Sequence, residues 1–172
     1  MSDHLYLIAL GSNQRLPLFG GPERVLAQAV AALETADVDV FAVSPTVRSA
    51  AIGPSRRCYA NAAAILSTSL SPPGLLAMLQ SIEAHFGRIR RGQNWQARTL
   101  DLDIILWSGG IWSSDAPALA IPHYAMRKRG FVLGPAQVIV PDWRDPVSNL
   151  SIRHLFHRLN RSKQLDPHGK RL

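Results

Sequence analysis

A run of seven residues, Arg98-Thr99-Leu100-Asp101-Leu102-Asp103-Ile104, carries the clearest chemical signal in the chain. Successive side chains of a strand alternate between its faces, so Asp101 and Asp103 share one face. The other face is aliphatic, with Leu100, Leu102, Ile104 and Leu106. The carboxylates lie about 6–7 Å apart along the strand and repel by about 2.5 kcal/mol at an effective dielectric constant of about 20. One or two Mg²⁺ ions remove that penalty and create a phosphate-binding site, whereas a solvated strand face is the alternative.

Basic side chains gather just upstream of this strand, at Arg88, Arg90, Arg91 and Arg98, with Trp95 among them. Guanidinium groups bind phosphate oxygens in bidentate pairs. Phosphoryl transfer requires metal ligands on one side of a phosphate chain and fixed positive charge on the other. The segment therefore indicates phosphate chemistry, with a solvated basic loop as the alternative.

Composition limits the class of protein. The 172 residues are 47% hydrophobic and 18% charged, which is typical of one folded domain and excludes a disordered chain. The net charge of +7 attracts anions but does not choose between nucleotides and nucleic acid. Cys58 is the only cysteine, and the N-terminus lacks the basic region of a secretion signal. Because no apolar run approaches about 18 residues, we expect a cytoplasmic protein that does not enter membranes.

Hydrophobic periodicity and turn residues predict the order of elements. Strands are expected at 5–10, 38–48, 59–66 and from the end of the loop at 88–97 to about Trp107, and helices from Pro22, from Pro72 to Gly87, near 125–139 and at 151–159. Ser71 is the expected cap of the second helix. Gly11-Ser12-Asn13 is expected to be a tight exit from the first strand, and the segment between Gly110 and Ile121 to be irregular.

The order strand, helix, strand, strand, helix, strand matches the ferredoxin-like βαββαβ unit of the α+β class. It predicts an antiparallel sheet with helices on one face and an open ligand site, with Asp101 and Asp103, on the other. Without repeats or a linker, residues 1–160 are expected to form one domain, and residues 161–172 a basic, frayed tail.

Five motifs follow one another along the chain: Ala9-Leu10-Gly11-Ser12-Asn13, Tyr59-x-Asn61, Gly87-Arg88-Ile89-Arg90, the run at 98–104, and Pro122-His123-Tyr124-x-Met126-x-x-Arg129-Gly130-Phe131. Together they resemble the 6-hydroxymethyl-7,8-dihydropterin pyrophosphokinases of folate synthesis over most of residues 5–145. The resemblance implies a ferredoxin-like diphosphokinase that moves the pyrophosphoryl group of ATP to the pterin hydroxymethyl oxygen and releases AMP. It also implies two bound Mg²⁺ ions.

The resemblance assigns roles to individual residues. Asp101 and Asp103 are expected to bind both metal ions, and Arg88 and Arg98 to hold the phosphates and stabilise the leaving AMP. The remaining ATP contacts are expected from Gln80, Glu83, Arg90, Trp95, Ile104 (through its backbone), His123, Tyr124 and Arg129. The loop at 88–97 is expected to close as a lid, with Trp95 excluding water.

The pterin is a flat bicycle with donors and acceptors on its edges, so a slot between two aromatic faces fits it. By the resemblance, Tyr59 and Phe131 sandwich the ring, and Asn61 reads its edge because an amide donates and accepts at once. The backbone of Ser49 and Ile52 completes the edge contacts, and Trp95 covers the site. The implied partners are small molecules only, with the product passed to dihydropteroate synthase, and the protein is expected to be a monomer.

The chain departs from the family pattern in the lid and near the expected ATP site. Gln96 and Ala97 replace the usual Gly-Pro before Arg98, which changes the lid hinge. Ala118 and Ala120 stand where a basic and a hydroxyl residue usually touch ATP. Two alternatives therefore stay open: a degenerate pterin- or nucleotide-binding relative, and an enzyme for a modified pterin.

An RNA-binding module is the alternative from another class, because RNA-recognition domains share this topology and the chain is basic. Arg129-Gly130-Phe131 resembles the start of their aromatic motif, but Val132-Leu133-Gly134 lacks the aromatic residues that follow. Asp101 and Asp103 on the binding face would also repel phosphate. An enzyme that binds no nucleic acid is thus favoured.

Overall fold

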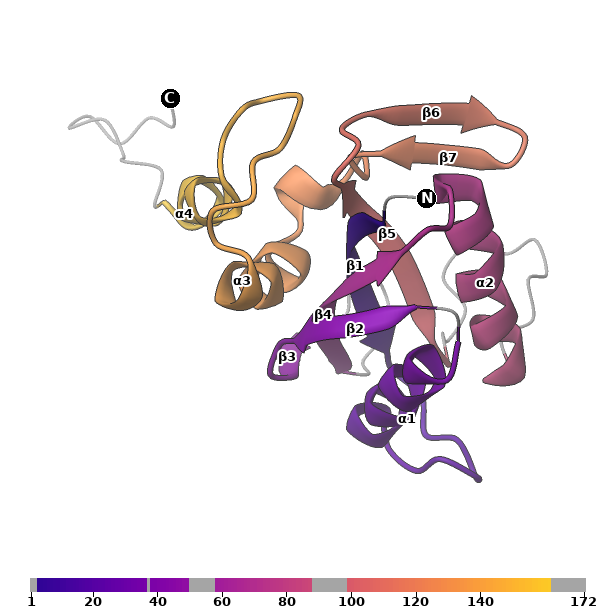
Figure 1. Ribbon diagram of the computed structural model, residues 1–172. Helices are drawn as coiled ribbons and strands as arrows, with labels where there is room; N and C mark the ends of the chain where they lie inside the picture. The colour runs from indigo at the N-terminus through magenta and orange to yellow at the C-terminus, as the bar shows by residue number, and fades with distance from the viewer. Residues whose placement is uncertain (1–2, 37, 50–57, 88–98, 162–172) are drawn as a thin grey trace.

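The computed structural model describes residues 3–36, 38–49, 58–87 and 99–161 (Figure 1). In chain order, their elements are β1 (His4–Ser12), α1 (Pro22–Glu34), β2 (Asp39–Val43), β3 (Val47–Ser49), β4 (Tyr59–Thr68), α2 (Pro72–His85), β5 (Asp101–Trp107), β6 (Trp112–Asp115), β7 (Ala118–Ile121), the 3₁₀ turn η1 (Met126–Lys128), α3 (Gly130–Ile139) and α4 (Ile152–Asn160).

The main sheet has the strand order β2-β4-β1-β5, and every pair of neighbours is antiparallel. The short β3 also pairs with β4, while β6 and β7 form a separate two-stranded sheet. Strand β1 pairs with β4 on one side and with β5 on the other, so the first strand lies in the middle of the sheet. The chain between β1 and β4 contains α1, β2 and β3. The predicted ferredoxin-like α+β fold is confirmed.

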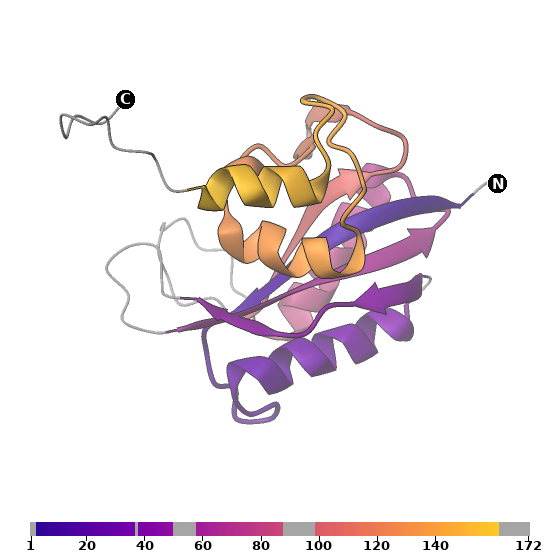
Figure 2. The same ribbon diagram turned by 90° about the vertical axis from the view of Figure 1, so that its left-hand side faces the viewer.

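Helices lie on both faces of the sheet. Helices α1 and α2 cover one face, and α3 and α4 pack on the other, where α3 contacts β4 (Figure 2). The second face was expected to be open to ligands, and α3 packs against part of it. The apolar stripe of α3 is buried against this face, on which Asp101 is partly exposed.

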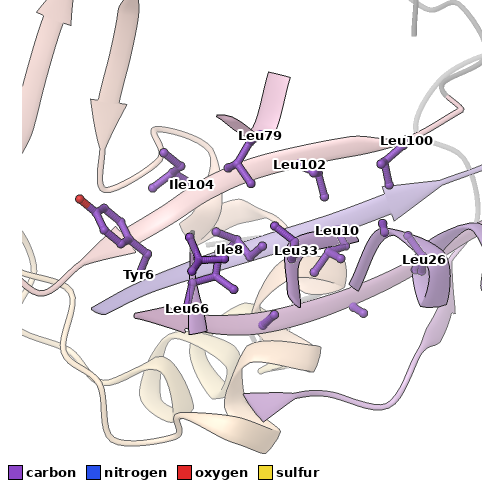
Figure 3. Packing of buried hydrophobic residues seen from close by; sticks show 14 of the residues in the cluster. Tyr6, Ile8, Leu10, Leu26, Leu33, Leu66, Leu79, Leu100, Leu102 and Ile104 are labelled. Atoms are coloured by element: carbon purple, nitrogen blue, oxygen red, sulfur yellow. The ribbon is translucent and has the colours of Figure 1, made fainter. Parts of the chain in front are cut away.

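Two clusters of buried side chains correspond to the two faces. The first cluster lies under α1 and α2 (Figure 3) and includes Tyr6, Ile8, Leu10, Leu26, Leu33, Leu66, Leu79, Leu100, Leu102 and Ile104. The second lies under α3 and α4 and includes Leu7, Ala63, Ile65, Ile105, Leu106, Met126, Leu133 and Leu155. Each fully buried Leu or Ile stabilises the fold by roughly 2 kcal/mol, so the sheet is held from both sides.

A bulge on β5 changes which face its last residues occupy. Ile8 pairs with Ile104 and Leu7 with Leu106, so Ile105 is the extra residue between them. Ile105 and Leu106 both belong to the second cluster. The prediction that Leu106 shares a face with Leu100 was wrong, because strict alternation ends at the bulge.

The predicted strand at 38–48 is two strands, β2 and β3, interrupted at Ser44-Pro45. Pro45 has no backbone N–H to donate to a ladder. The hydroxyl of Ser44 accepts the N–H of Ala63 at 3.0 Å, and the Ser44 N–H donates to the Ala63 carbonyl at 2.9 Å. A side chain thus substitutes for part of the broken ladder, and both pieces stay paired with β4.

The C-terminal part differs most from the prediction. The segment expected to be irregular contains the hairpin β6-β7, in which Trp112 pairs with Ile121. The Trp112 ring packs edge-on against the Trp107 ring, with centroids 5.9 Å apart. The helix expected near 125–139 is divided into η1 and α3, because Arg129 has an extended backbone (φ −113°, ψ 97°). This break turns the Arg129 side chain towards the sheet.

The helix ends are mostly as predicted. Helix α1 begins at Pro22, and Gly87 follows α2 with φ 76°. Ser71 occupies the cap position of α2 but its side chain makes no capping hydrogen bond, whereas Ser151 caps α4 by accepting from the His154 N–H. No helix in the described part of the chain has the length and apolar character needed to cross a membrane.

Candidate active site

Asp101 and Asp103 lie on the face of β5 that is opposite to the buried side chains of Leu102 and Ile104. Asp101 pairs with Gly11 and Asp103 with Ala9 on β1, while Leu102 is buried between them in the first cluster. Both aspartates are only partly buried, and 34% of the Asp103 side chain is exposed. The strand thus presents two carboxylates to solvent from a backbone that is anchored in the core.

Glu83 on α2 anchors this strand from the edge. Its side chain is 1% exposed, and its Oε1 accepts the backbone N–H of Leu102 at 2.8 Å. Strand β5 is at the sheet edge, so this N–H points away from β1 and needs a partner from another element. Glu83, expected to bind ATP, is placed by the structure as the buried support of the residue between the two aspartates.

Ile104 lies on this edge strand, and Gln80 lies on the helix α2 that contacts the strand. Backbone groups two residues apart on a strand point the same way, so the N–H and C=O of Ile104 face the side on which Glu83 meets Leu102. The Ile104 side chain is buried in the first cluster, which leaves its backbone as the group to contact a ligand. Gln80 is half-buried on α2, one turn before Glu83.

Two cationic or polar side chains from the segment after β7 approach Asp103. Nη1 of Arg129 lies 3.8 Å from Oδ2 of Asp103, and Nε2 of His123 lies 4.0 Å from the same oxygen. Both distances exceed hydrogen-bond length, so neither group is locked onto the carboxylate. His123 is itself fixed to the strand, because its N–H donates to the carbonyl of Ile105 at 3.0 Å. The β5 bulge therefore positions His123.

The protonation state of His123 follows from its surroundings. Burial lowers its pKa, and the positive charge of Arg129 lowers it further, to about 4, against the opposing effect of Asp101. Nδ1 accepts the backbone N–H of Ala125 at 3.1 Å, so in the neutral ring the proton is on Nε2. His123 thus offers an N–H donor at neutral pH. Tyr124 stacks on the imidazole with ring centroids 4.7 Å apart and is 77% exposed.

Of the residues expected to bind the pterin, Ser49, Tyr59, Asn61 and Phe131 are described by the structure. Asn61 and Tyr59 share a face of β4, and Asn61 is 5% exposed with its Nδ2 donating to the hydroxyl of Ser49 at 2.9 Å. Phe131 is half-buried in the first turn of α3, the helix that packs over β4. The Arg129 guanidinium lies 5.8 Å from the Phe131 ring centroid. Arg129 therefore links the Phe131 ring to Asp103.

Strand register brings these two groups together. Gly11 on β1 pairs with Asn61 on one side and with Asp101 on the other, and Ala9 likewise pairs with Ala63 and Asp103. Asn61, Gly11 and Asp101 thus form one row across three adjacent strands. Neighbouring strands are about 4.8 Å apart, so the amide and the carboxylate face one shared strip of sheet.

The sequence patterns did not predict that residues 11 and 12 belong to this site. Gly11 and Ser12 were expected in a tight exit, but both are inside β1. The Ser12 hydroxyl is buried and donates to the carbonyl of Thr99 at 2.6 Å, two residues before Asp101. The apolar run of residues 5–10 stops before Gly11-Ser12, so no local signal in the sequence extends the strand over these two residues.

Five of the predicted site residues, Ile52, Arg88, Arg90, Trp95 and Arg98, lie outside the described residues, as do the lid positions Gln96 and Ala97. Their assigned roles stay predictions. Ala118 and Ala120 are both exposed on β7, on the hairpin that follows β5. Among the residues that the structure describes, no group of three or more His, Cys, Asp or Glu side chains is arranged to hold a metal ion.

Comparison with known proteins adds independent evidence. The family model of 7,8-dihydro-6-hydroxymethylpterin-pyrophosphokinase matches residues 7–141. The chain is 43% identical over 125 residues to the 2-amino-4-hydroxy-6-hydroxymethyldihydropteridine pyrophosphokinase of Synechocystis, covering 73% of this chain and 63% of that protein. The enzymes of the same name from Pseudomonas aeruginosa and Haemophilus influenzae are 41% and 38% identical. Those matches cover 81% and 83% of this chain and 82% and 86% of the relatives.

Proposed function

Because the chain belongs to the 7,8-dihydro-6-hydroxymethylpterin-pyrophosphokinase family, we propose that it transfers the pyrophosphoryl group of ATP to 6-hydroxymethyl-7,8-dihydropterin. The hydroxymethyl oxygen forms a bond to the β-phosphorus of ATP and its proton is released to solvent, while the bond from that phosphorus to the oxygen bridging it to the α-phosphorus breaks and AMP leaves. The products are the pterin diphosphate and AMP, as required for folate synthesis. One observation carries the proposal: Asn61 and Asp101 lie in one row of the sheet, with Arg129 beside Asp103.

Two carboxylates fit Mg²⁺ without a larger cluster. Mg²⁺ is usually held by one or two carboxylates together with substrate phosphates and water, rather than by an all-protein cage. Asp101 and Asp103 supply hard oxygen donors on one face of an anchored strand. We assign them two Mg²⁺ ions, which, when bound with ATP, neutralise phosphate charge and polarise the transferred phosphorus.

The site residues around Asp101 and Asp103 hold and orient ATP. His123 donates from Nε2 to a phosphate oxygen and does not serve as the base, since Nδ1 already accepts the N–H of Ala125. Arg129 adds a fixed positive charge beside Asp103. The backbone of Ile104, with Gln80 beside it, receives the adenine end, and Tyr124 contacts the phosphates.

Tyr59 and Phe131 hold the faces of the pterin, while Asn61 and Ser49 read its edge. Arg88 and Arg90 in the loop at 88–97, and Arg98 directly after it, hold the phosphate chain. Trp95 of that loop and the backbone of Ile52 complete the pterin site. Closure of that loop excludes water, which would otherwise hydrolyse ATP. The product is passed to dihydropteroate synthase, and the enzyme acts as a cytoplasmic monomer.

The test is to mix the protein with Mg²⁺, ATP and 6-hydroxymethyl-7,8-dihydropterin and to follow AMP. AMP that forms only when both pterin and Mg²⁺ are present supports the proposal. Binding of pterin or ATP by calorimetry without AMP formation favours a degenerate relative or a modified pterin, for which the exposed Ala118 and Ala120 would be the first positions to examine. Binding of neither substrate refutes the assignment.

A further inference from the structure

The backbone conformation at residue 11 does not require a glycine. Gly11 lies inside β1, hydrogen-bonded between β4 and β5, and its φ is outside the left-handed region that favours glycine. A Cβ built on Gly11 would lie 3.7 Å from Oδ1 of Asn61 and 3.9 Å from Cβ of Asp101, both ordinary van der Waals distances. Glycine inside a strand destabilises the fold relative to alanine. Neither conformation nor crowding therefore explains why no side chain is present.

The neighbouring row of the same face differs in this respect. Ala9, between Ala63 and Asp103, carries a Cβ that packs against the second cluster. Gly11, two residues on, is half-buried with Asn61 on one side and Asp101 on the other. A glycine inside a strand often marks a place where a ligand approaches the backbone closely. The missing side chain leaves a strip of bare backbone between an amide and a carboxylate.

We propose that Gly11 is a specificity-determining residue of the substrate site, keeping open the strip over which the flat pterin ring and its hydroxymethyl arm reach from Asn61 to Asp101. The inference rests on the proposed function and adds a residue to it. With the ring edge at the amide, the arm points along the row towards the carboxylate. A side chain at residue 11 would lift the ring from the sheet and move the hydroxymethyl oxygen away from the phosphates.

The test uses Gly11→Ala and Gly11→Val, with Gly74→Ala as the matched control. Gly74 is in the first turn of α2, where a Cβ would meet Ser71 Oγ at 3.5 Å and Leu70 Cδ2 at 3.6 Å, so this glycine also accepts alanine. Removing a glycine should leave the melting temperature of both alanine variants unchanged or raised by about 2–4 °C. Pterin and ATP binding are measured separately by calorimetry, and turnover by AMP formation.

We expect the Gly11 variants to bind pterin more weakly, and Gly11→Ala to do so without a loss of stability. One added methyl in a close-fitting pocket weakens binding by about 10- to 200-fold, so the pterin Kd should rise by about tenfold in Gly11→Ala and by more in Gly11→Val. ATP binding should be unchanged, and Gly74→Ala should bind and turn over like the parent protein.

Parent-like pterin binding by both Gly11 variants overturns this inference and leaves the proposed function intact, provided that the parent forms AMP. A parallel loss of melting temperature, ATP binding and pterin binding in Gly11→Ala also overturns it, since glycine would then be required by the fold. If the parent protein itself binds no pterin and forms no AMP, the proposed function fails and this inference fails with it.

Discussion

Arg127 and Asp145 form a two-point ion pair that ties the 3₁₀ turn η1 to the loop before α4. Nε and Nη2 of Arg127 each lie 2.7 Å from a different carboxylate oxygen of Asp145, which is fully buried. The same carboxylate accepts the N–H of Val147 and both the N–H and the hydroxyl of Ser148. Because Arg129 follows Arg127 by two residues, the pair fixes the segment that places a cation beside Asp103.

Asp145→Ala should lower the free energy of unfolding by about 3 kcal/mol, because it leaves Arg127 and two loop N–H groups without their acceptor. Urea denaturation measures the change. Asp142→Ala is the matched control, since Asp142 is 83% exposed and pairs with the exposed Arg153 at 2.8 Å. It should cost less than about 1 kcal/mol. Equal losses in the two variants would contradict the importance of the buried pair.

The same pair predicts how stability depends on pH. Burial alone would raise the pKa of Asp145, but hydrogen bonds from Arg127, Ser148 and Val147 outweigh it and lower the pKa from 3.8 to about 2. A carboxyl whose pKa is lower in the folded state stabilises above its unfolded pKa, and this contribution is lost as the pH falls from about 3.8 to about 2. The stability difference between the parent and Asp145→Asn should therefore shrink over that range. Urea midpoints at a series of pH values test this, and a constant difference would refute it.

Asp101→Ala and Asp103→Ala should each abolish Mg²⁺-dependent AMP formation and leave the fold intact, because both side chains are partly exposed while the strand is held by its buried neighbours. Circular dichroism checks folding, and AMP release checks turnover. Asp39→Ala is the control, an exposed aspartate at the start of β2 on the far side of the sheet. Near-normal turnover in either site variant would exclude the metal-binding role.

Glu83 variants distinguish a structural support from an ATP ligand that depends on charge. Glu83→Gln retains an acceptor for the Leu102 N–H, so stability and turnover should stay close to those of the parent. Glu83→Leu leaves that N–H unsatisfied and should cost about 2 kcal/mol, with reduced turnover because the aspartate strand loses its support. Both are measured by urea denaturation and AMP release. A stable Glu83→Gln protein without activity would instead show that the carboxylate charge is needed.

Local patterns in the chain predicted the parts of the fold that depend on neighbouring residues. The start of α1 at Pro22, the end of α2 before Gly87 and the end of β5 at Trp107 are confirmed. Each follows from a preference of the residue itself or from a short alternation, so no distant contact is needed to recognise it. The same alternation placed Asp101 and Asp103 on one face.

Contacts between distant residues account for what the patterns could not predict. The bulge at Ile105 lets β5 pair with β1 and also pack against the second cluster. It also positions His123, whose N–H donates to the Ile105 carbonyl. The break at Arg129 likewise depends on η1 being held from the later loop by Asp145.

Gly11 illustrates the difference between the two kinds of information. The chain shows a glycine near the end of a strand, and a turn is its simplest local explanation. Its position between Asn61 and Asp101 depends on the register of three strands, set by side chains separated by 50 to 90 residues. Residue types and spacing therefore indicate the chemistry that we propose for this protein. The packing of the sheet determines which groups face each other, because register depends on contacts between distant parts of the chain.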